Sequence, residues 1–208
     1  MGVDADVSAL ARLLQRKIDS DPEQLDRLRD SAIFALAAQS LDASELEHRM
    51  QRGEELVRNH TRSAVVGALA AISPGSDILI QGAVGISLVK SMCSLYGVPV
   101  SQLEIDRLLK LGQSRLNRHI AVLMAVTGNA LKAFPGLGTL AGGALHAVTY
   151  GMIFDALGRS LNETLAKRGE LATLPVVNRF TETLGDQLEK RTAEIVRMVM
   201  EAKKPRRQ

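Results

Sequence analysis

The sequence predicts an all-α protein, a helical bundle with two apolar helical hairpins between amphipathic helices at both ends. Apolar residues recur at helical spacing near both termini. Aromatic residues make up only 3% of the 208 residues, and the low content of aromatic and β-branched side chains argues against a sheet-rich fold. The single cysteine, Cys93, excludes an internal disulfide framework and suits a reducing compartment.

The first region, residues 1–62, is charged and amphipathic. Its apolar residues form two helical stripes, which are Val7, Leu10, Leu14 and Ile18, and then Leu25, Leu28, Ala32 and Leu36. Pro22 suits the first position of the second helix. Ser44 and Glu47 have the spacing of a capping box, which predicts that a third helix begins there. We therefore expect three amphipathic helices in this region.

The second region, residues 63–158, is mostly apolar. Asp77 is the only charged side chain between Ser63 and Val89, and a second apolar stretch follows over residues 120–157. Asp77 lies at the start of an apolar run, where a carboxylate stabilises the free N–H groups and the dipole of a helix. We expect Asp77 to cap this helix, and the alternative is a functional acid at the tip of a hairpin.

The two apolar stretches have the features of a degenerate repeat. Pro135-Gly136 in the second matches Pro74-Gly75 in the first, and Gly158 and Gly97 follow them at equal spacing. Proline ends a helix and glycine allows the chain to reverse, so we expect two hairpins whose second arms are equal in length and whose tips lie at one end. The tip residues are Pro74, Gly75, Asp77, Pro135, Gly136 and Gly138.

Small residues at helical spacing predict close contact between helices, either in lipid or in a soluble hairpin. The residues concerned are Gly67, Ala71, Gly142, Gly143, Ala147 and Gly151.

The third region, residues 159–208, is polar and helical. A helix is expected to begin at Pro175 and to carry one apolar stripe of Val177, Phe180, Leu184, Leu188, Ile195 and Val199. The chain ends in a basic tail of Lys203, Lys204, Arg206 and Arg207. Such a tail either is a solvated terminus or binds anionic lipid head groups by electrostatic attraction.

Neither apolar stretch offers the about 20 continuous apolar residues that a spanning helix needs. Each arm instead matches about half of the ~30 Å hydrocarbon core. Lys and Arg flank both stretches, so the flanks are expected on the cytoplasmic side and the hairpins would enter and leave by the same face. The alternative is a soluble bundle in which the same segments form the core.

Motifs that carry chemistry are weak. Gly136-Leu-Gly138-Thr-Leu-Ala141, followed by Asp155, matches a dinucleotide-binding fingerprint, but no strand precedes it. Lys90-Ser91 lacks the glycine that a phosphate-binding loop needs. The histidines, among them His146, have no metal-ligand spacing. We expect no catalytic, cofactor-binding or metal site, with His146 as an interior hydrogen-bonded residue and Cys93 as a core residue.

Three short segments carry a resemblance to a known family. They are Ala70-Ala71-Ile72-Ser73-Pro74-Gly75-Ser76-Asp77, Leu95-Tyr96-Gly97 and Phe134-Pro135-Gly136-Leu137-Gly138-Thr139. In these segments the chain resembles the YcjF-like family of bacterial proteins, several of which are inner-membrane proteins found with Era-like or dynamin-like GTPases. The resemblance implies a helical hairpin domain that works with a GTPase and a membrane, and it implies no catalytic residues. This chain has no GTPase domain, so the GTPase would be a separate protein.

The expected function is that of a membrane-associated helical scaffold or adaptor, not an enzyme, on the cytoplasmic face of the inner membrane. Membrane lipid is the expected partner, a separate GTPase and a second copy of the chain are further candidates, and nucleic acid is not expected. The alternative is a cytoplasmic, soluble module for protein–protein interaction, or a carrier of a small apolar ligand.

Overall fold

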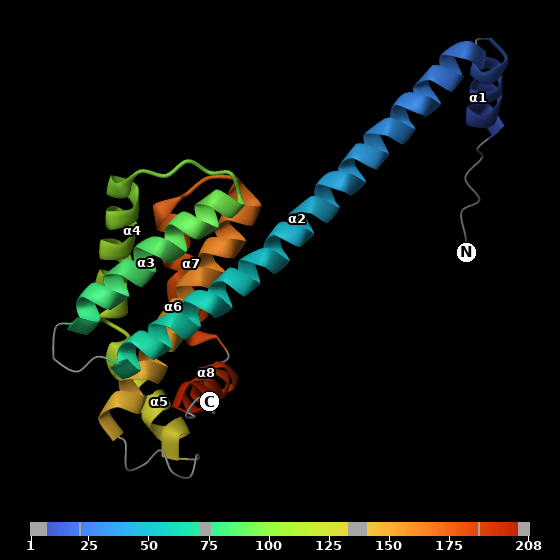
Figure 1. Ribbon diagram of the computed structural model, residues 1–208. Helices are drawn as coiled ribbons and strands as arrows, with labels where there is room; N and C mark the ends of the chain where they lie inside the picture. Colours follow the sequence, from blue (N-terminus) through green and yellow to red (C-terminus); the bar gives the residue numbers. More distant parts are fainter. Residues whose placement is uncertain (1–7, 21, 71–75, 133–140, 187, 204–208) are drawn as a thin grey trace, which may run out of the picture. The chain divides into compact units, whose positions relative to one another are not determined.

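The computed structural model describes residues 8–20, 22–70, 76–132, 141–186 and 188–203. These residues form eight helices and no strand (Figure 1). The helices are α1 (Ser8–Ser20), α2 (Pro22–Ala70), α3 (Ser76–Leu95), α4 (Gln102–Leu116), α5 (Ile120–Lys132), α6 (Ala141–Arg168), α7 (Thr173–Gly185) and α8 (Leu188–Lys203). The predicted all-α helical bundle is confirmed. Contacts divide the chain into an N-terminal unit, Met1–Glu47, and a C-terminal unit, His48–Gln208.

Helix α2 is continuous over 49 residues, so the prediction that a third helix begins at Ser44 is wrong. A capping box marks a helix start only where the preceding chain leaves the helical conformation. Residues 23–43 include no glycine or proline, and Leu41 and Ala43 are good helix formers. The expected region boundary after residue 62 therefore falls inside α2, and the one after residue 158 falls inside α6.

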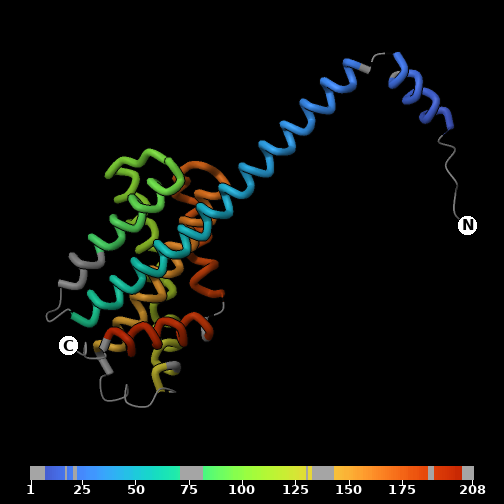
Figure 2. The backbone as a smooth tube through the Cα atoms, turned by 45° about the vertical axis from the view of Figure 1, so that its right-hand side comes forward, coloured from blue at the N-terminus to red at the C-terminus, as the bar shows by residue number. Residues whose placement is uncertain are grey.

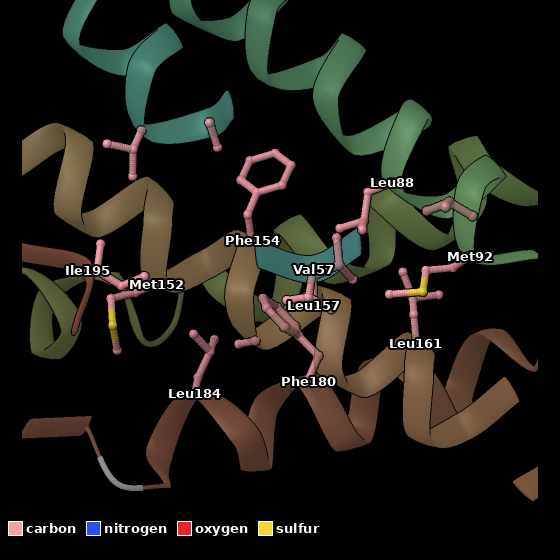
Figure 3. Packing of buried hydrophobic residues seen from close by; sticks show 14 of the residues in the cluster. Val57, Leu88, Met92, Met152, Phe154, Leu157, Leu161, Phe180, Leu184 and Ile195 are labelled. Atoms are coloured by element: carbon pink, nitrogen blue, oxygen red, sulfur yellow. The ribbon is translucent and has the colours of Figure 1, made fainter. Parts of the chain in front are cut away.

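The C-terminal unit is built around α6, which packs against α3, α5, α7 and α8. Figure 2 shows the same arrangement from a second direction, with the C-terminal part of α2 and α3 side by side and antiparallel. Side chains from α2, α3, α6, α7 and α8 converge on one core, among them Val57, Leu88, Leu161, Phe180 and Ile195 (Figure 3). Each of these five is at most 3% exposed, which places the centre of the core along α6.

Glycines allow α2 and α6 to approach closely. A Cβ built on Gly158 would lie 2.7 Å from a methyl carbon of Val57, and one built on Gly151 would lie 2.9 Å from a methyl carbon of Val65. A Cβ on Gly53 would overlap the amide of Asn162. The side chains of one helix therefore occupy the space that the glycines of the other leave open.

The second arms of the two expected hairpins are unequal, contrary to the prediction. Helix α3 ends at Leu95, and Gly97 follows it with a φ of 68° while Pro99 prevents further helix. Helix α6 instead continues through Gly158 to Arg168 and ends before Gly169, which has a φ of 65°. The next proline after Gly158 is Pro175, beyond the end of α6, so this glycine stays inside the helix.

The predicted single C-terminal helix is two helices. Helix α7 begins at Thr173, so Pro175 lies in its first turn, where a missing N–H costs nothing. It ends at Gly185, and the backbone of Asp186 is extended. Helix α8 then begins at Leu188. Glycine and aspartate are poor helix formers, which explains the break.

Candidate functional site

The C-terminal unit contains a cavity of about 460 Å³ among helices α3 to α7. Its walls are mainly apolar, and they include Leu108, Leu116, Ile120, Met124, Ile153 and Phe154. Phe154 and Phe180, which both line this cavity, belong to the core shown in Figure 3. The volume lies in the range of about 300–1,000 Å³ that small-molecule sites occupy. The cavity is therefore large enough to hold a ligand.

Two glycines keep part of the wall open. Gly112 is buried in the middle of α4, yet a Cβ built there would meet no atom within 4 Å. Gly82 on α3 is exposed and also lines the cavity, and a Cβ built on it would likewise meet no atom within 4 Å. Glycine inside a helix costs about 1 kcal/mol relative to alanine. Because packing does not require glycine at position 112, its effect there is to leave the cavity unfilled.

The polar groups of the cavity come mainly from α4 and α6. Thr149 is only 6% exposed, and its buried Oγ1 atom has no hydrogen-bond partner in the structure. The rings of His146 and Tyr150 meet edge to face, with centroids 4.7 Å apart. Gln113 and Asn117 are exposed residues of the lining. Among the described residues that line the cavity there is no Asp, Glu, Lys or Arg.

The prediction that His146 is an interior residue is wrong, because the structure leaves it exposed where α6 borders the cavity. Cys93 is fully buried in the core, as predicted. Burial raises the pKa of its thiol to about 11, and the negative charge of Glu104 adds to this shift. The thiol therefore stays protonated and unreactive in the folded protein at neutral pH.

Asp155 belongs to an ion-pair network and not to a nucleotide site. Its carboxylate accepts from Arg159 Nε at 3.1 Å and from Arg191 Nη1 at 3.1 Å, while Arg159 also pairs with Glu54 at 3.0 Å. Burial alone would lower the pKa of Arg159, but Asp155 and Glu54 outweigh this effect and raise it. The carboxylate joins α6 to α8 and, through Arg159, to α2, so both of its oxygens are already occupied.

A second buried polar contact joins the turn after α3 to α6 and α2. The hydroxyl of Tyr96 donates to Asn162 Oδ1 at 2.7 Å, and Asn162 Nδ2 donates to the carbonyl of Met50 at 3.0 Å. Burial raises the pKa of Tyr96 to about 12. His60 on α2 also lies 3.2 Å from the hydroxyl of Ser87 on α3, through Nε2. These contacts fix the positions of α2, α3 and α6 relative to one another.

Most of the expected hairpin-tip residues and the basic tail lie outside the described residues. These are Pro74, Gly75, Pro135, Gly136, Gly138, Lys204, Arg206 and Arg207. Asp77 is the second residue of α3 and Lys203 is the last residue of α8, and the side chains of both lie outside the described part.

The residues expected to bring helices together are placed differently from one another. Ala147 and Gly151 are buried on α6, and Gly151 faces Val65 and Ile195. Gly143 is exposed, and a Cβ there would meet nothing within 4 Å. Gly67 is half-buried on α2. Ala71 and the surroundings of Gly142 lie outside what the structure describes.

The N-terminal unit presents a different candidate surface. On α1 the side chains of Leu10, Leu13, Leu14 and Ile18 are each at least 50% exposed. On α2 the same is true of Leu28, Ile33, Phe34, Leu36 and Leu41. The two apolar stripes found in the sequence are therefore largely uncovered within the described chain. Exposed apolar residues on adjacent turns of a helix indicate a surface that binds a protein or a membrane.

Comparison with known proteins finds no family model that matches this chain and no significant match among curated proteins or solved structures. None of the helices in the described part combines the length and apolar character needed to cross a bilayer. The described residues also hold no cluster of three or more His, Cys, Asp or Glu side chains placed to bind a metal ion.

Proposed function

We propose that this protein is a membrane-associated helical adaptor, in which α1 lies in the plane of the membrane surface. The observation that carries the proposal is the exposed apolar face of α1, where Leu10, Leu14 and Ile18 recur every four residues. Arg12 and Arg16 have the same spacing on the opposite face. A short helix with leucines on one face and arginines on the other binds at the boundary of head groups and acyl chains.

The charges of the two N-terminal helices assign them different roles. In α1 the basic residues Arg12, Arg16 and Lys17 outnumber the acidic Asp19, which favours anionic lipid. In residues 22–47 acidic residues outnumber basic ones, which disfavours the same surface. We therefore assign lipid binding to α1, and protein binding to the N-terminal part of α2.

A protein partner for α2 is supported by the run from Ser31 to Leu41, which has no charged residue. Ile33, Phe34 and Leu36 point in different directions around the helix axis, and all are more than half exposed. A helix that is apolar on all sides is stable only when it is buried. The resemblance to the YcjF-like family makes a separate GTPase the first candidate for this partner, on the cytoplasmic face of the inner membrane.

Flotation with vesicles tests the lipid assignment. The full chain should float with vesicles of phosphatidylglycerol and phosphatidylethanolamine. The variant with Leu14→Asp and Ile18→Asp should bind at least tenfold more weakly, because losing one buried leucine costs about 1.5–3 kcal/mol. The matched control is Leu103→Asp, because Leu103 is 72% exposed on α4 in the C-terminal unit. Equal flotation of all three proteins, or of none, would overturn the proposal.

A soluble interaction module is the second candidate, and it is favoured by the apolar run from Ser31 to Leu41. It predicts that the chain does not bind vesicles but forms a defined complex through α2. Sedimentation equilibrium tests whether the partner is a second copy of this chain. In that case the wild-type chain should self-associate and the Phe34→Asp variant should stay monomeric. Capture of a GTPase from the host by the full chain, lost in Phe34→Asp, would identify the other partner.

A further inference from the structure

We propose that the cavity of the C-terminal unit binds one uncharged, mainly hydrocarbon molecule that carries a hydroxyl or carbonyl group. The inference goes beyond the adaptor function and does not depend on it, because the cavity residues all belong to α3–α7 and the connection after α4, and the exposed face of α1 belongs to the N-terminal unit.

The cavity is too large to be a packing defect. Protein interiors are packed as densely as organic crystals and hold few voids larger than a water molecule. At about 460 Å³ the cavity exceeds an engineered void of about 150 Å³ that already binds benzene. The cavity is partly open to solvent, because Gln113, Met124 and His146 in its lining are exposed, so a bound apolar molecule would displace water from the apolar side chains around it.

The chemical class of the ligand follows from the charges of the lining. A buried ion without a partner is strongly destabilised, and no Asp, Glu, Lys or Arg belongs to the described lining. Leu108, Leu116 and Ile153 instead offer hydrocarbon surface. The cavity therefore selects an uncharged molecule over a carboxylate or an ammonium of equal length.

The presence of a hydroxyl or carbonyl group on the ligand is inferred from Thr149. Its Oγ1 is buried without a hydrogen-bond partner, and the residue lines the cavity. Leaving a buried polar group unpaired is costly, and most such groups in proteins are paired. A ligand oxygen beside Thr149 satisfies this group. Gln113 and Asn117, which are exposed at the lining, can hold further polar atoms of the ligand near water.

A substitution at Gly112 tests whether the ligand binds in this cavity. Leucine at this position would project into the open space and fill it, and it would replace a glycine inside a helix by a good helix former. The matched control is Gly128→Leu on α5. Gly128 is also helical and also has no atom within 4 Å of a built Cβ, but it does not line the cavity.

The experiment measures fluorescence of the neutral apolar probe N-phenyl-1-naphthylamine with the full chain, without lipid. The wild type should bind one probe per chain. Gly112→Leu should lower the affinity at least tenfold while its thermal midpoint does not fall, and Gly128→Leu should bind as the wild type does. Probe binding that survives Gly112→Leu, or no saturable binding by the wild type, would overturn the proposal.

Competition then tests the chemical class. Dodecanol should displace the probe at least tenfold better than dodecanoate, and equal displacement by both would contradict an uncharged ligand. Thr149→Val should weaken dodecanol binding about fivefold, as expected for one lost hydrogen bond. Thr127→Val is the matched control, because Thr127 Oγ1 is also buried and unpartnered but lies outside the lining. If Gly112→Leu does not fold, the comparison of Thr149→Val with Thr127→Val decides whether the ligand binds in the cavity.

Discussion

At the scale of single residues, the buried polar side chains were the least predictable part of the protein. Asn162 and Asp155 lie on one helix, and nothing in their sequence neighbourhood indicates that Asn162 contacts α2 and the turn after α3, or that Asp155 contacts α8. Their partners Tyr96, Met50 and Arg191 are distant in sequence, so the pairing depends on the tertiary fold. Cys93 was predictable because a lone cysteine within an apolar stretch is most often a core residue.

Asp155→Asn should destabilise the protein by about 3 kcal/mol, because it leaves Arg191 and Arg159 with a weaker partner in a partly buried site. The value is at the low end for buried pairs, since the two guanidiniums are 18% and 31% exposed. Urea unfolding measures the change. The control is Glu163→Gln at the more exposed pair with Arg179, which should cost about 1 kcal/mol or less. Equal losses in both variants would contradict the role of the network.

Stability should fall as the pH rises from about 9 to 12. The pKa of Cys93 is raised from 9.0 to about 11 and that of Tyr96 from 10.0 to about 12 in the folded protein. Both groups are neutral when protonated, so above pH 9 the unfolded chain releases protons that the folded chain retains, and unfolding becomes more favourable. The urea midpoint of the double variant Cys93→Ala, Tyr96→Phe should depend less on pH in this window. An unchanged slope would refute this cause.

At the scale of helices, the sequence predicted the elements well and their ends less well. Periodicity identified α1 and the first part of α2, because apolar residues recur there at helical spacing and Pro22 marks the first position of the second helix. It failed at Ser44, where a capping pair lies inside a continuous helix, and at Gly158, where a glycine resembles Gly97 but no proline follows it within α6. A local motif thus ends a helix only when the flanking residues also disfavour the helix.

Glycine-to-alanine changes should separate the helix contact from helix propensity. Gly158→Ala should destabilise the protein despite a propensity gain of about 1 kcal/mol, because the new Cβ would meet Val57. Gly128→Ala meets no atom within 4 Å and should be neutral or stabilising. Thermal unfolding followed by circular dichroism compares the two. If Gly158→Ala were as stable as Gly128→Ala, α2 and α6 would not be closely packed there.

At the scale of the whole molecule, the fold class was predictable and the cavity was not. Helical periodicity requires only the sequence of each segment, whereas the cavity needs the positions of five helices at once. Gly112 was the one available signal, because an isolated glycine within an otherwise helical pattern usually has a packing or functional reason. The exposed faces of α1 and α2 were recognised as apolar stripes, but their exposure depends on which helices pack elsewhere.

A fragment that begins at Ala43 should fold without the rest of the N-terminal unit. Among the described residues, the buried core runs from Val57 to Val199 and lies in the C-terminal unit. At the new terminus Ser44 can act as the N-cap of the shortened helix, with Glu47 at the capping-box position. We expect cooperative thermal unfolding within a few degrees of the full chain. A non-cooperative transition would show that residues 1–42 contribute to the core.

The central position of α6 has a consequence for the order of synthesis. Helices α3 and α5 leave the ribosome before α6, yet both bury apolar side chains against it. Until Arg168 has emerged, the nascent chain carries apolar faces that no other part of it covers. The growing chain is therefore most open to aggregation, and most in need of a chaperone, between the appearance of α3 and the completion of α6.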